Sequence, residues 1–213
     1  GLVGSEMCIR DRYMELDLTA RHNLELTETM RGKEKKGSLL WVLDKTRTAM
    51  GHRLIRSWME RPLLSPVQVN KRLDAVEDLV GDAIARQEIA ECLREVTDLE
   101  RLIGRIVYGT AGARDLVALS GGLGKLPRLR ALLAPFRSSL LTVLRESIDD
   151  LQDLREHIAR ALVEEPPFSV REGGFIKAGY NSDVDYLRDI MTNGKSMVAS
   201  IEQSEREKTG IKN

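Results

Sequence analysis

The clearest helical pattern in the chain runs from residue 181 to residue 208. Its apolar residues recur at spacings of three and four, which places them on one face of a helix. They are Val184, Leu187, Met191, Val198 and Ile201, with Gly194 in the one vacant place. After Ile201 the apolar stripe stops, but residues 202–208 remain strong helix formers. Ser182 and Asp185 fit a capping box at the start, so the pattern predicts one continuous helix, about 42 Å long.

That length is close to the full diameter expected for a compact domain of this size, so the helix should protrude from its domain. We expect Leu187, Met191, Val198 and Ile201 to pack its base against the rest of the protein, while the tip stays free. On this hypothesis, replacing Met191 by Asp uncouples the helix from the domain because it disrupts that packing.

The preceding segments also show helical periodicity, with one apolar and one charged face, as the helices of a bundle do. Ser65-Pro66 with Gln68, and Thr97 with Glu100, are helix-start signals, whereas Pro62 and Pro127 are stop signals. The apolar faces comprise residues 54, 55, 58 and 59; 69, 73, 76 and 80; 99, 102, 103 and 106; 116, 119, 123 and 126; 129, 132 and 133; 140, 144 and 148; and 151, 154, 158 and 162. The sequence therefore predicts an all-α fold, with a multi-helix core over 13–180 and a long helix over 181–213.

One interruption breaks the helical pattern. Glu165 and two prolines are followed by two short apolar segments, 168–170 and 175–177, which flank residues 171–174 (REGG). Glycine at such a turn supplies positive φ angles, and this arrangement is typical of a small β-hairpin. A hairpin here could brace the base of the long helix.

Composition limits the possible functions. Lys and Arg (33) balance Asp and Glu (33), so the formal net charge is zero, which argues against a domain that grips nucleic acid on its own. The balance still allows a scaffold whose partner domains hold DNA.

Cys8 and Cys92 give neither a disulfide framework nor metal-binding spacing. No segment resembles a signal peptide or membrane span. We expect a cytoplasmic protein, with Cys92 buried among apolar neighbours.

The first twelve residues, 1–12, match neither a helical nor a strand pattern. They resemble translated sequencing-adapter read-through, so we expect a non-native tail and exclude it from the fold. A disordered native tail is the alternative.

A possible phosphate-binding loop lies at residues 120–126 (SGGLGKL), but Leu119 stands where its first glycine is required. Leu126 stands where Ser or Thr would hold magnesium, and the segment lies within a helical leucine stripe. We therefore expect no nucleotide site there.

Other candidate residues also lack the spacing of a site. His22, His52 and His157 are scattered, which argues against zinc. Asp149-Asp150 and Glu164-Glu165 lie at helix ends, where carboxylates usually cap or are solvated. A basic cluster could contact phosphate, although a solvated or ion-paired helix face is the simpler interpretation at zero net charge; it comprises Lys45, Arg47, Arg53 and Arg56. The sequence predicts no catalytic, cofactor-binding or metal-binding residue, and it leaves DNA-contacting residues unassigned.

Five segments, in order, resemble the core domain of bacterial MutS mismatch-repair ATPases. The most extensive is 38–58 (SLLWVLDKTRTAMGHRLIRSW). The others are 16–26 (LDLTARHNLEL), 97–105 (TDLERLIGR), 172–181 (EGGFIKAGYN) and 205–211 (EREKTGI). Together they cover the chain from about residue 13 to 213. His22 departs from the more usual basic residue at its position.

The resemblance implies a helical core with a lever helix that leads to a DNA clamp, and an ATPase at the far end of the subunit. On this basis we expect a fragment that ends at the start of the clamp. The family's mismatch-reading Phe-x-Glu motif is absent, since Phe136, Phe168 and Phe175 are followed two places later by Ser, Val and Lys. The full-length family uses ATP and magnesium, forms homodimers, binds mismatched DNA and cooperates with a MutL-type partner. In this fragment we expect a mechanical role and no enzymatic activity.

Two alternatives remain at this point. The chain could be a helical protein–protein scaffold with no nucleic-acid role, since zero charge and missing catalytic residues suit both. It could also belong to a MutS paralogue that lacks mismatch recognition and serves recombination or ribosome surveillance.

Overall fold

The computed structural model describes residues 12–210, so the tail prediction for residues 1–12 lies almost wholly outside the described residues. The fold is built from helices, which confirms the predicted all-α class. In chain order they are α2 (Leu18–Asn23), α3 (Leu39–Leu43), α4 (Ala49–Glu60), α5 (Pro66–Gly81), α6 (Ala83–Arg94), α7 (Leu99–Val107), α8 (Ala113–Leu123), α9 (Leu126–Leu132), α10 (Ser139–Ser147), α11 (Gln152–Ala161), the 3₁₀ turn η1 (Val170–Glu172) and α12 (Ser182–Thr209).

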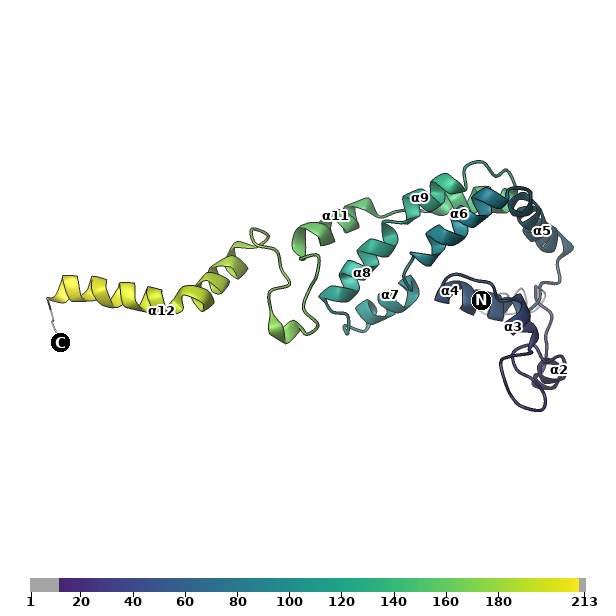
Figure 1. Ribbon diagram of the computed structural model, residues 1–213, viewed down its shortest axis with the longest axis horizontal. Helices are drawn as coiled ribbons and strands as arrows, with labels where there is room; N and C mark the ends of the chain where they lie inside the picture. Colours follow the sequence, from purple (N-terminus) through teal and green to yellow (C-terminus); the bar gives the residue numbers. More distant parts are fainter. Residues whose placement is uncertain (1–11, 211–213) are drawn as a thin grey trace, which may run out of the picture.

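The molecule is elongated and can be described in three parts (Figure 1). Helices α2–α4 form an N-terminal group, α5–α11 form what we call the body, and α12 extends away from the body at the opposite end. The accessible surface of the chain is 16,054 Å². A compact monomer of this mass exposes about 9,900 Å². The fold therefore leaves far more surface uncovered than a self-contained domain does.

The first of two apolar clusters in the body lies where α5 and α6 meet α9 and α10. Its buried residues are Ala75, Ala85, Leu133, Phe136 and Leu141. Asp78 on α5 accepts hydrogen bonds from the backbone N–H groups of Arg137 (3.1 Å) and Ser138 (2.7 Å), which fixes the start of α10. Because this carboxylate satisfies otherwise unpaired N–H groups, it ties the loop to the apolar cluster.

The second cluster lies where α11 packs against α8, at the end of the body nearest to α12. Ile158, Ala161 and Leu162 are buried there, with Phe175 and Ile176 packed against them. The segment that leads into the long helix is therefore part of the core of the body.

The N-terminal group is held mainly by the segment around Ser38, which is 1% exposed. The Ser38 hydroxyl donates to the carbonyl of Lys35 (2.8 Å) and accepts from the backbone N–H of Trp41 (3.2 Å), so it caps α3. Helix α3 packs on α4, which ends at Glu60 before Pro62, as the sequence predicts.

Two capping predictions and one helix-end prediction were wrong. Asp98, and not Thr97, caps α7, because the Thr97 hydroxyl donates to the carbonyl of Ala118 on α8 (3.2 Å). Ser65 precedes α5 as predicted but makes no side-chain capping bond. Pro127 lies in the first turn of α9 and does not end the previous helix, which stops at Leu123.

The predicted β-hairpin was also wrong. Residues 175–177 pair with the end of α11 instead, through a bridge between Leu162 and Ile176. Ser169 caps the 3₁₀ turn η1, since Glu172 Oε1 accepts from the Ser169 N–H (2.9 Å) and Ser169 Oγ accepts from the Arg171 N–H (3.2 Å). This local capping competes with strand pairing, and it leaves Phe168 86% exposed.

Within residues 12–210, no helix has both the length and the apolar character needed to cross a membrane.

Candidate functional site: the junction of the body and the long helix

Helix α12 begins at Ser182 and ends at Thr209, which confirms the predicted continuous helix. Asn181 caps it, and not Ser182 as the sequence suggested. The Asn181 side-chain oxygen accepts hydrogen bonds from the N–H groups of Asp183 and Val184, both at 3.0 Å. At the other end Gly210 adopts the left-handed conformation (φ 67°) that commonly closes a helix. Local chemistry therefore sets both ends of this helix.

Polar contacts attach the first two turns of α12 to the body. Asp185 accepts a hydrogen bond from the N–H of Gly179 (2.7 Å), and Arg188 donates to the carbonyl of Ile176 (2.9 Å). Arg188 also pairs with Asp185 (3.3 Å). Because Ile176 packs against the second apolar cluster, Arg188 links the long helix directly to the core of the body.

A second contact joins the end of α11 to the loop before α12. The Tyr180 hydroxyl lies 3.2 Å from Nε2 of His157, and the two rings meet edge to face. Lys177 donates to the carbonyl of Ala159 on α11 (2.7 Å). Together with the Arg188 bond, these contacts fix the direction in which the helix leaves the body.

The expectation that the apolar stripe of α12 packs its base was wrong. Leu187, Met191, Val198 and Ile201 are 59%, 87%, 65% and 60% exposed. Figure 1 shows why: beyond its first turns, α12 has no other helix beside it. The packing argument for Met191→Asp therefore does not hold for this chain, and the junction depends on Asp185, Arg188 and Tyr180 instead.

The middle of α12 contains residues that weaken a helix. Thr192 donates its hydroxyl to the carbonyl of Arg188 (2.8 Å), and Ser196 donates to that of Asn193 (2.7 Å). Gly194 lies between them, and a Cβ atom there would have no neighbour within 4 Å. Such back-bonding and glycine favour bending. Figure 1 shows α12 bending part-way along its length.

The N-terminal group is attached to the body at the start of α7 by a multiple ion pair. Arg53 on α4 donates two hydrogen bonds to Asp98 (2.9 and 2.7 Å) and two to Glu100 (2.6 and 3.0 Å). This arrangement holds the pKa of Asp98 below its usual range, chiefly through the hydrogen bonds from Arg53. The basic cluster is therefore divided, since Arg53 and Arg56 are ion-paired while Lys45 and Arg47 line a hollow described below.

The glycine-rich segment at 120–126 serves packing. Gly122 is buried, and a Cβ atom added to it would lie 2.4 Å from the Thr97 hydroxyl oxygen. Lys125 forms an ion pair with Glu95 and so is not directed at an empty phosphate cradle. These contacts give the segment a packing role between α8 and the residues before α7.

The remaining candidate side chains lie apart from one another. His52 pairs with Asp44, His157 meets Tyr180, and His22 lies in the last turn of α2. Asp149 caps Leu151 (3.0 Å), Asp150 pairs with Arg155 (3.0 Å), and Glu164 and Glu165 are exposed. In the described part of the chain, no group of three His, Cys, Asp or Glu residues could hold a metal ion.

Cys92 is 1% exposed, which confirms the predicted burial, and its Sγ lies 3.7 Å from the carbonyl of Lys125. Burial raises the pKa of this thiol. A buried thiol with a raised pKa is a poor nucleophile.

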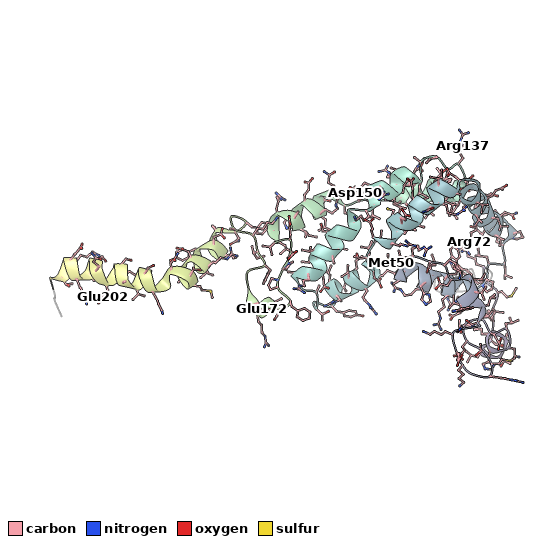
Figure 2. The ribbon with its side chains drawn as sticks, in the orientation of Figure 1. Met50, Arg72, Arg137, Asp150, Glu172 and Glu202 are labelled. Atoms are coloured by element: carbon pink, nitrogen blue, oxygen red, sulfur yellow. The ribbon has the colours of Figure 1, made fainter. Side chains whose placement is uncertain are left out.

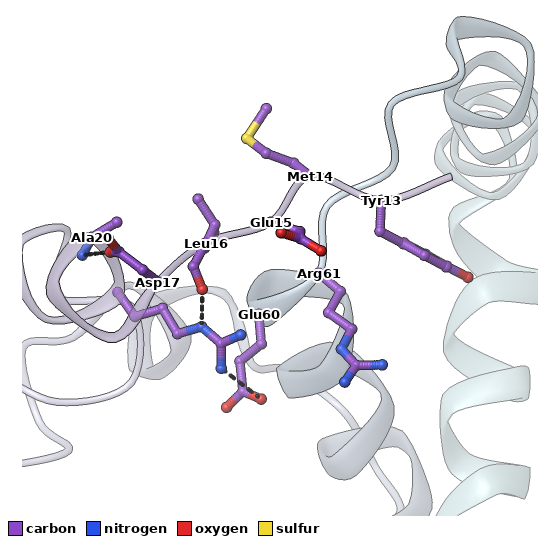
Figure 3. Close-up of a pocket in the computed structure, with 9 residues that line it drawn as sticks. Tyr13, Met14, Glu15, Leu16, Asp17, Ala20, Glu60 and Arg61 are labelled. Carbon is purple, nitrogen blue, oxygen red and sulfur yellow. Dashed lines mark hydrogen bonds and ion pairs between the residues drawn. The ribbon is translucent and has the colours of Figure 1, made fainter. Parts of the chain in front are cut away.

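A hollow of about 620 Å³ lies where the described chain begins, between residues 13–21 and the end of α4 (Figure 3). Arg21 occupies one side, where it donates to the carbonyl of Leu16 (2.9 Å) and lies 3.8 Å from a Glu60 oxygen. Asp17 caps α2 through the N–H of Ala20 (2.6 Å). These polar side chains hold residues 16–21 against the end of α4.

Comparison with known proteins identifies the architecture. The MutS domain III family matches residues 19–211. The DNA mismatch repair protein MutS of Lachnoclostridium phytofermentans is 48% identical over 96% of this chain. The proteins of the same name from Brevibacillus brevis and Listeria innocua are 50% and 46% identical, each over 94% of this chain. The chain spans only 22–23% of the length of these relatives.

Proposed function

Because the chain belongs to the MutS domain III family, we propose that it is the core and lever part of a longer DNA mismatch repair ATPase. Its role is to couple ATP-driven conformational change to the closing of a clamp around mismatched DNA. Within the chain, residues 13–180 are the core and residues 181–213 the lever. The observation that carries the proposal is α12, a 28-residue helix attached to the body through its first two turns.

The geometry suits transmission of motion. A helix that is fixed at one end moves as a rigid body when its base rotates, which is a common element of conformational coupling. Arg188 and Asp185 fix the base through the carbonyl of Ile176 and the N–H of Gly179. The exposed stripe beyond them leaves the outer part of α12 available to other segments of the protein.

In this proposal the chemistry lies outside these 213 residues. ATP and magnesium bind elsewhere in the longer protein, which acts as a homodimer on mismatched duplex DNA in the cytoplasm with a MutL-type partner. The names of the relatives and the absence of a phosphate-binding loop motif from the sequence support this division. Purified 213-residue chain should not hydrolyse ATP; turnover by this chain would refute the division.

The coupling role is tested by changing the junction in the full-length protein. Arg188→Met removes the bond to Ile176, so we expect ATP-dependent release of DNA to be slowed while binding of mismatched duplex without ATP is retained. Arg206→Met is the matched control, because Arg206 lies on the same helix and, within residues 12–210, its side chain pairs only with Glu202 (2.6 Å). Figure 2 shows Glu202 on the part of α12 that lies far from the body.

Release kinetics can be followed by stopped-flow fluorescence of labelled DNA. If Arg188→Met and Arg206→Met both release DNA at the wild-type rate, the junction does not transmit the ATP signal.

The relatives also bear on the two alternatives. Three proteins named for DNA mismatch repair match nearly all of this chain, which favours that function over an unrelated scaffold. A paralogue without mismatch recognition would bind matched and mismatched duplexes equally. We expect the full-length protein to prefer the mismatched duplex in a competition assay.

A further inference from the structure

A basic hollow lies between the loop before α4 and one face of α6. Its volume is about 810 Å³, and its walls include residues 45–48 together with side chains from α6. Four cations and one carboxylate line it: Lys45, Arg47, Arg86, Arg94 and Glu91. The whole chain has no net charge, so this excess of positive charge is local.

Three of these cations have no partner among the described residues. Within residues 12–210, no hydrogen bond or ion pair involves the side chain of Lys45, Arg47 or Arg94. The neighbouring cations on α4 behave differently, because Arg53 and Arg56 both meet carboxylates. The hollow therefore brings together three cations that have no partner among residues 12–210, although comparable side chains on α4 are paired.

The other two charged groups of the hollow leave this excess unneutralised. Arg86 donates from Nη1 to the carbonyls of Leu79 (2.8 Å) and Val80 (3.2 Å), which holds its guanidinium at the end of α5. Glu91 accepts a hydrogen bond from the neutral amide of Gln87 (3.1 Å) and, in the described part of the chain, pairs with no cation. Arg86 is thus positioned while keeping its charge.

This combination matches the chemistry of a phosphate group. Guanidinium groups form paired, charge-assisted hydrogen bonds to phosphate oxygens, and several cations around one hollow can share the three oxygens. Gly51, in the first turn of α4, also lines the hollow, and its N–H already donates to the Thr48 hydroxyl (2.9 Å). The N-terminal end of a helix adds a favourable potential for an anion.

We propose that this hollow binds phosphate groups. Lys45, Arg47 and Arg94 contact the phosphate oxygens directly, and the fixed guanidinium of Arg86 orients the phosphate. The phosphates come either from a free oligophosphate or from the backbone of a nucleic acid. The site shares no residue with the junction at α12. A result that refutes the proposed lever role would therefore leave the phosphate site unaffected, and the reverse also holds.

The test is arginine footprinting in the full-length protein. Phenylglyoxal modifies accessible arginines, and mass spectrometry gives the rate at each one, so other phosphate sites in the protein do not interfere. Tripolyphosphate, a short DNA duplex and poly-glutamate are added separately. We expect tripolyphosphate, DNA or both to protect Arg47 and Arg94. Arg137 is the internal control, because it projects from the edge of the body far from α12 and is not among the lining residues (Figure 2).

Variants then test the assignment of individual residues. Lys45→Gln should raise the phosphate concentration that half-protects Arg94 about tenfold, since it removes one charge-assisted contact. Glu91→Gln should lower that concentration, because it removes the one carboxylate among the described residues that line the hollow. Arg137→Gln is the matched control and should leave it unchanged. For DNA, each lost cation should reduce the slope of log K against log salt by about 1.

The source of the phosphate follows from which probe protects. Protection by tripolyphosphate alone assigns a free oligophosphate, and protection by DNA alone assigns a nucleic acid backbone; either supports the site. Three outcomes would overturn the phosphate site. Poly-glutamate could protect Arg47 and Arg94 as well as the phosphate probes do, or Arg137→Gln could change the half-protecting concentration as much as Lys45→Gln does. The third is that no probe protects Arg47 and Arg94.

Discussion

The body and the long helix are built from the same kinds of residues but are stabilised differently. In α8, Leu119 and Leu123 recur at helical spacing and are buried. In α12, Leu187 and Met191 recur at the same spacing and are exposed. The difference shows that an amphipathic pattern specifies a helix without specifying that its apolar face is covered by the same chain.

The two regions also differ in what keeps them helical. The helices of the body pack on one another around two apolar clusters. Helix α12 relies on local contacts, including the Asn181 cap and pairs one turn apart such as Glu202 with Arg206 (2.6 Å) and Glu205 with Lys208 (2.9 Å). Exposed pairs of this kind contribute only about 0.3–0.5 kcal/mol each. The outer part of α12 should therefore be the least stable helix of the chain.

The largest expected difference comes from the same truncation in both regions. Leu141→Ala removes a buried side chain and should lower the free energy of unfolding by about 2–5 kcal/mol. Leu187→Ala removes an exposed one and should change it by less than about 0.5 kcal/mol. Chemical denaturation of the two variants measures both values. Equal losses would show that α12 is packed in solution.

Two glycines should respond with opposite sign. Gly122→Ala places a Cβ atom 2.4 Å from the Thr97 hydroxyl oxygen, so we expect a loss of about 1–3 kcal/mol. Gly194→Ala meets nothing within 4 Å and should stabilise α12 by about 1 kcal/mol through helix propensity. Thermal unfolding measures the loss in Gly122→Ala. Amide hydrogen exchange near residue 194 measures the gain in Gly194→Ala. Faster exchange in Gly194→Ala would contradict the view that this position is unconstrained by packing.

The caps offer a smaller contrast. Asn181→Ala removes the acceptor of two N–H groups and should loosen the first turn of α12 by about 1 kcal/mol, which corresponds to roughly fivefold faster exchange at Asp183 and Val184. Ser65→Ala, before α5, should change exchange little because Ser65 makes no side-chain capping bond. If Ser65→Ala speeds amide exchange in the first turn of α5 as much as Asn181→Ala does in α12, the intrinsic capping preference of the residue matters more than its observed side-chain hydrogen bonds.

The smallest expected effect is a pH dependence of the free energy of unfolding, which comes from Asp44 in the N-terminal group. Hydrogen bonds from Thr46 and then His52 lower the pKa of Asp44 to about 2. A carboxylate whose pKa is lower in the folded state stabilises the fold above its unfolded pKa, about 3.9, and loses that contribution as the pH falls. Stability should therefore decline between about pH 4 and pH 2. Asp44→Asn should make that decline shallower; an unchanged slope would exclude Asp44 as a contributor.

Much of the fold could be predicted from local patterns. The continuous helix at 182–209, the start of α5 at Pro66 and the end of α4 before Pro62 all follow from periodicity and proline. The five segments of family resemblance predicted the domain that the comparisons identify. These features depend on neighbours in sequence, which is why sequence alone reveals them.

The junction could not be predicted in the same way. Arg188 meets the carbonyl of Ile176, and Tyr180 meets His157, across a loop whose path was unknown. The expected hairpin failed because Ile176 found a partner at Leu162, the end of α11, which no local rule selects. The Arg53 contacts with Asp98 and Glu100 likewise join residues more than forty positions apart.

By itself the sequence determined where helices form, because capping, proline and periodicity act over a few residues. Only the tertiary structure decided which apolar faces are buried, which cations are paired and how α12 is attached. Burial and ion pairing depend on which distant segment arrives at a given face, and within residues 12–210 no other helix covers the outer face of α12.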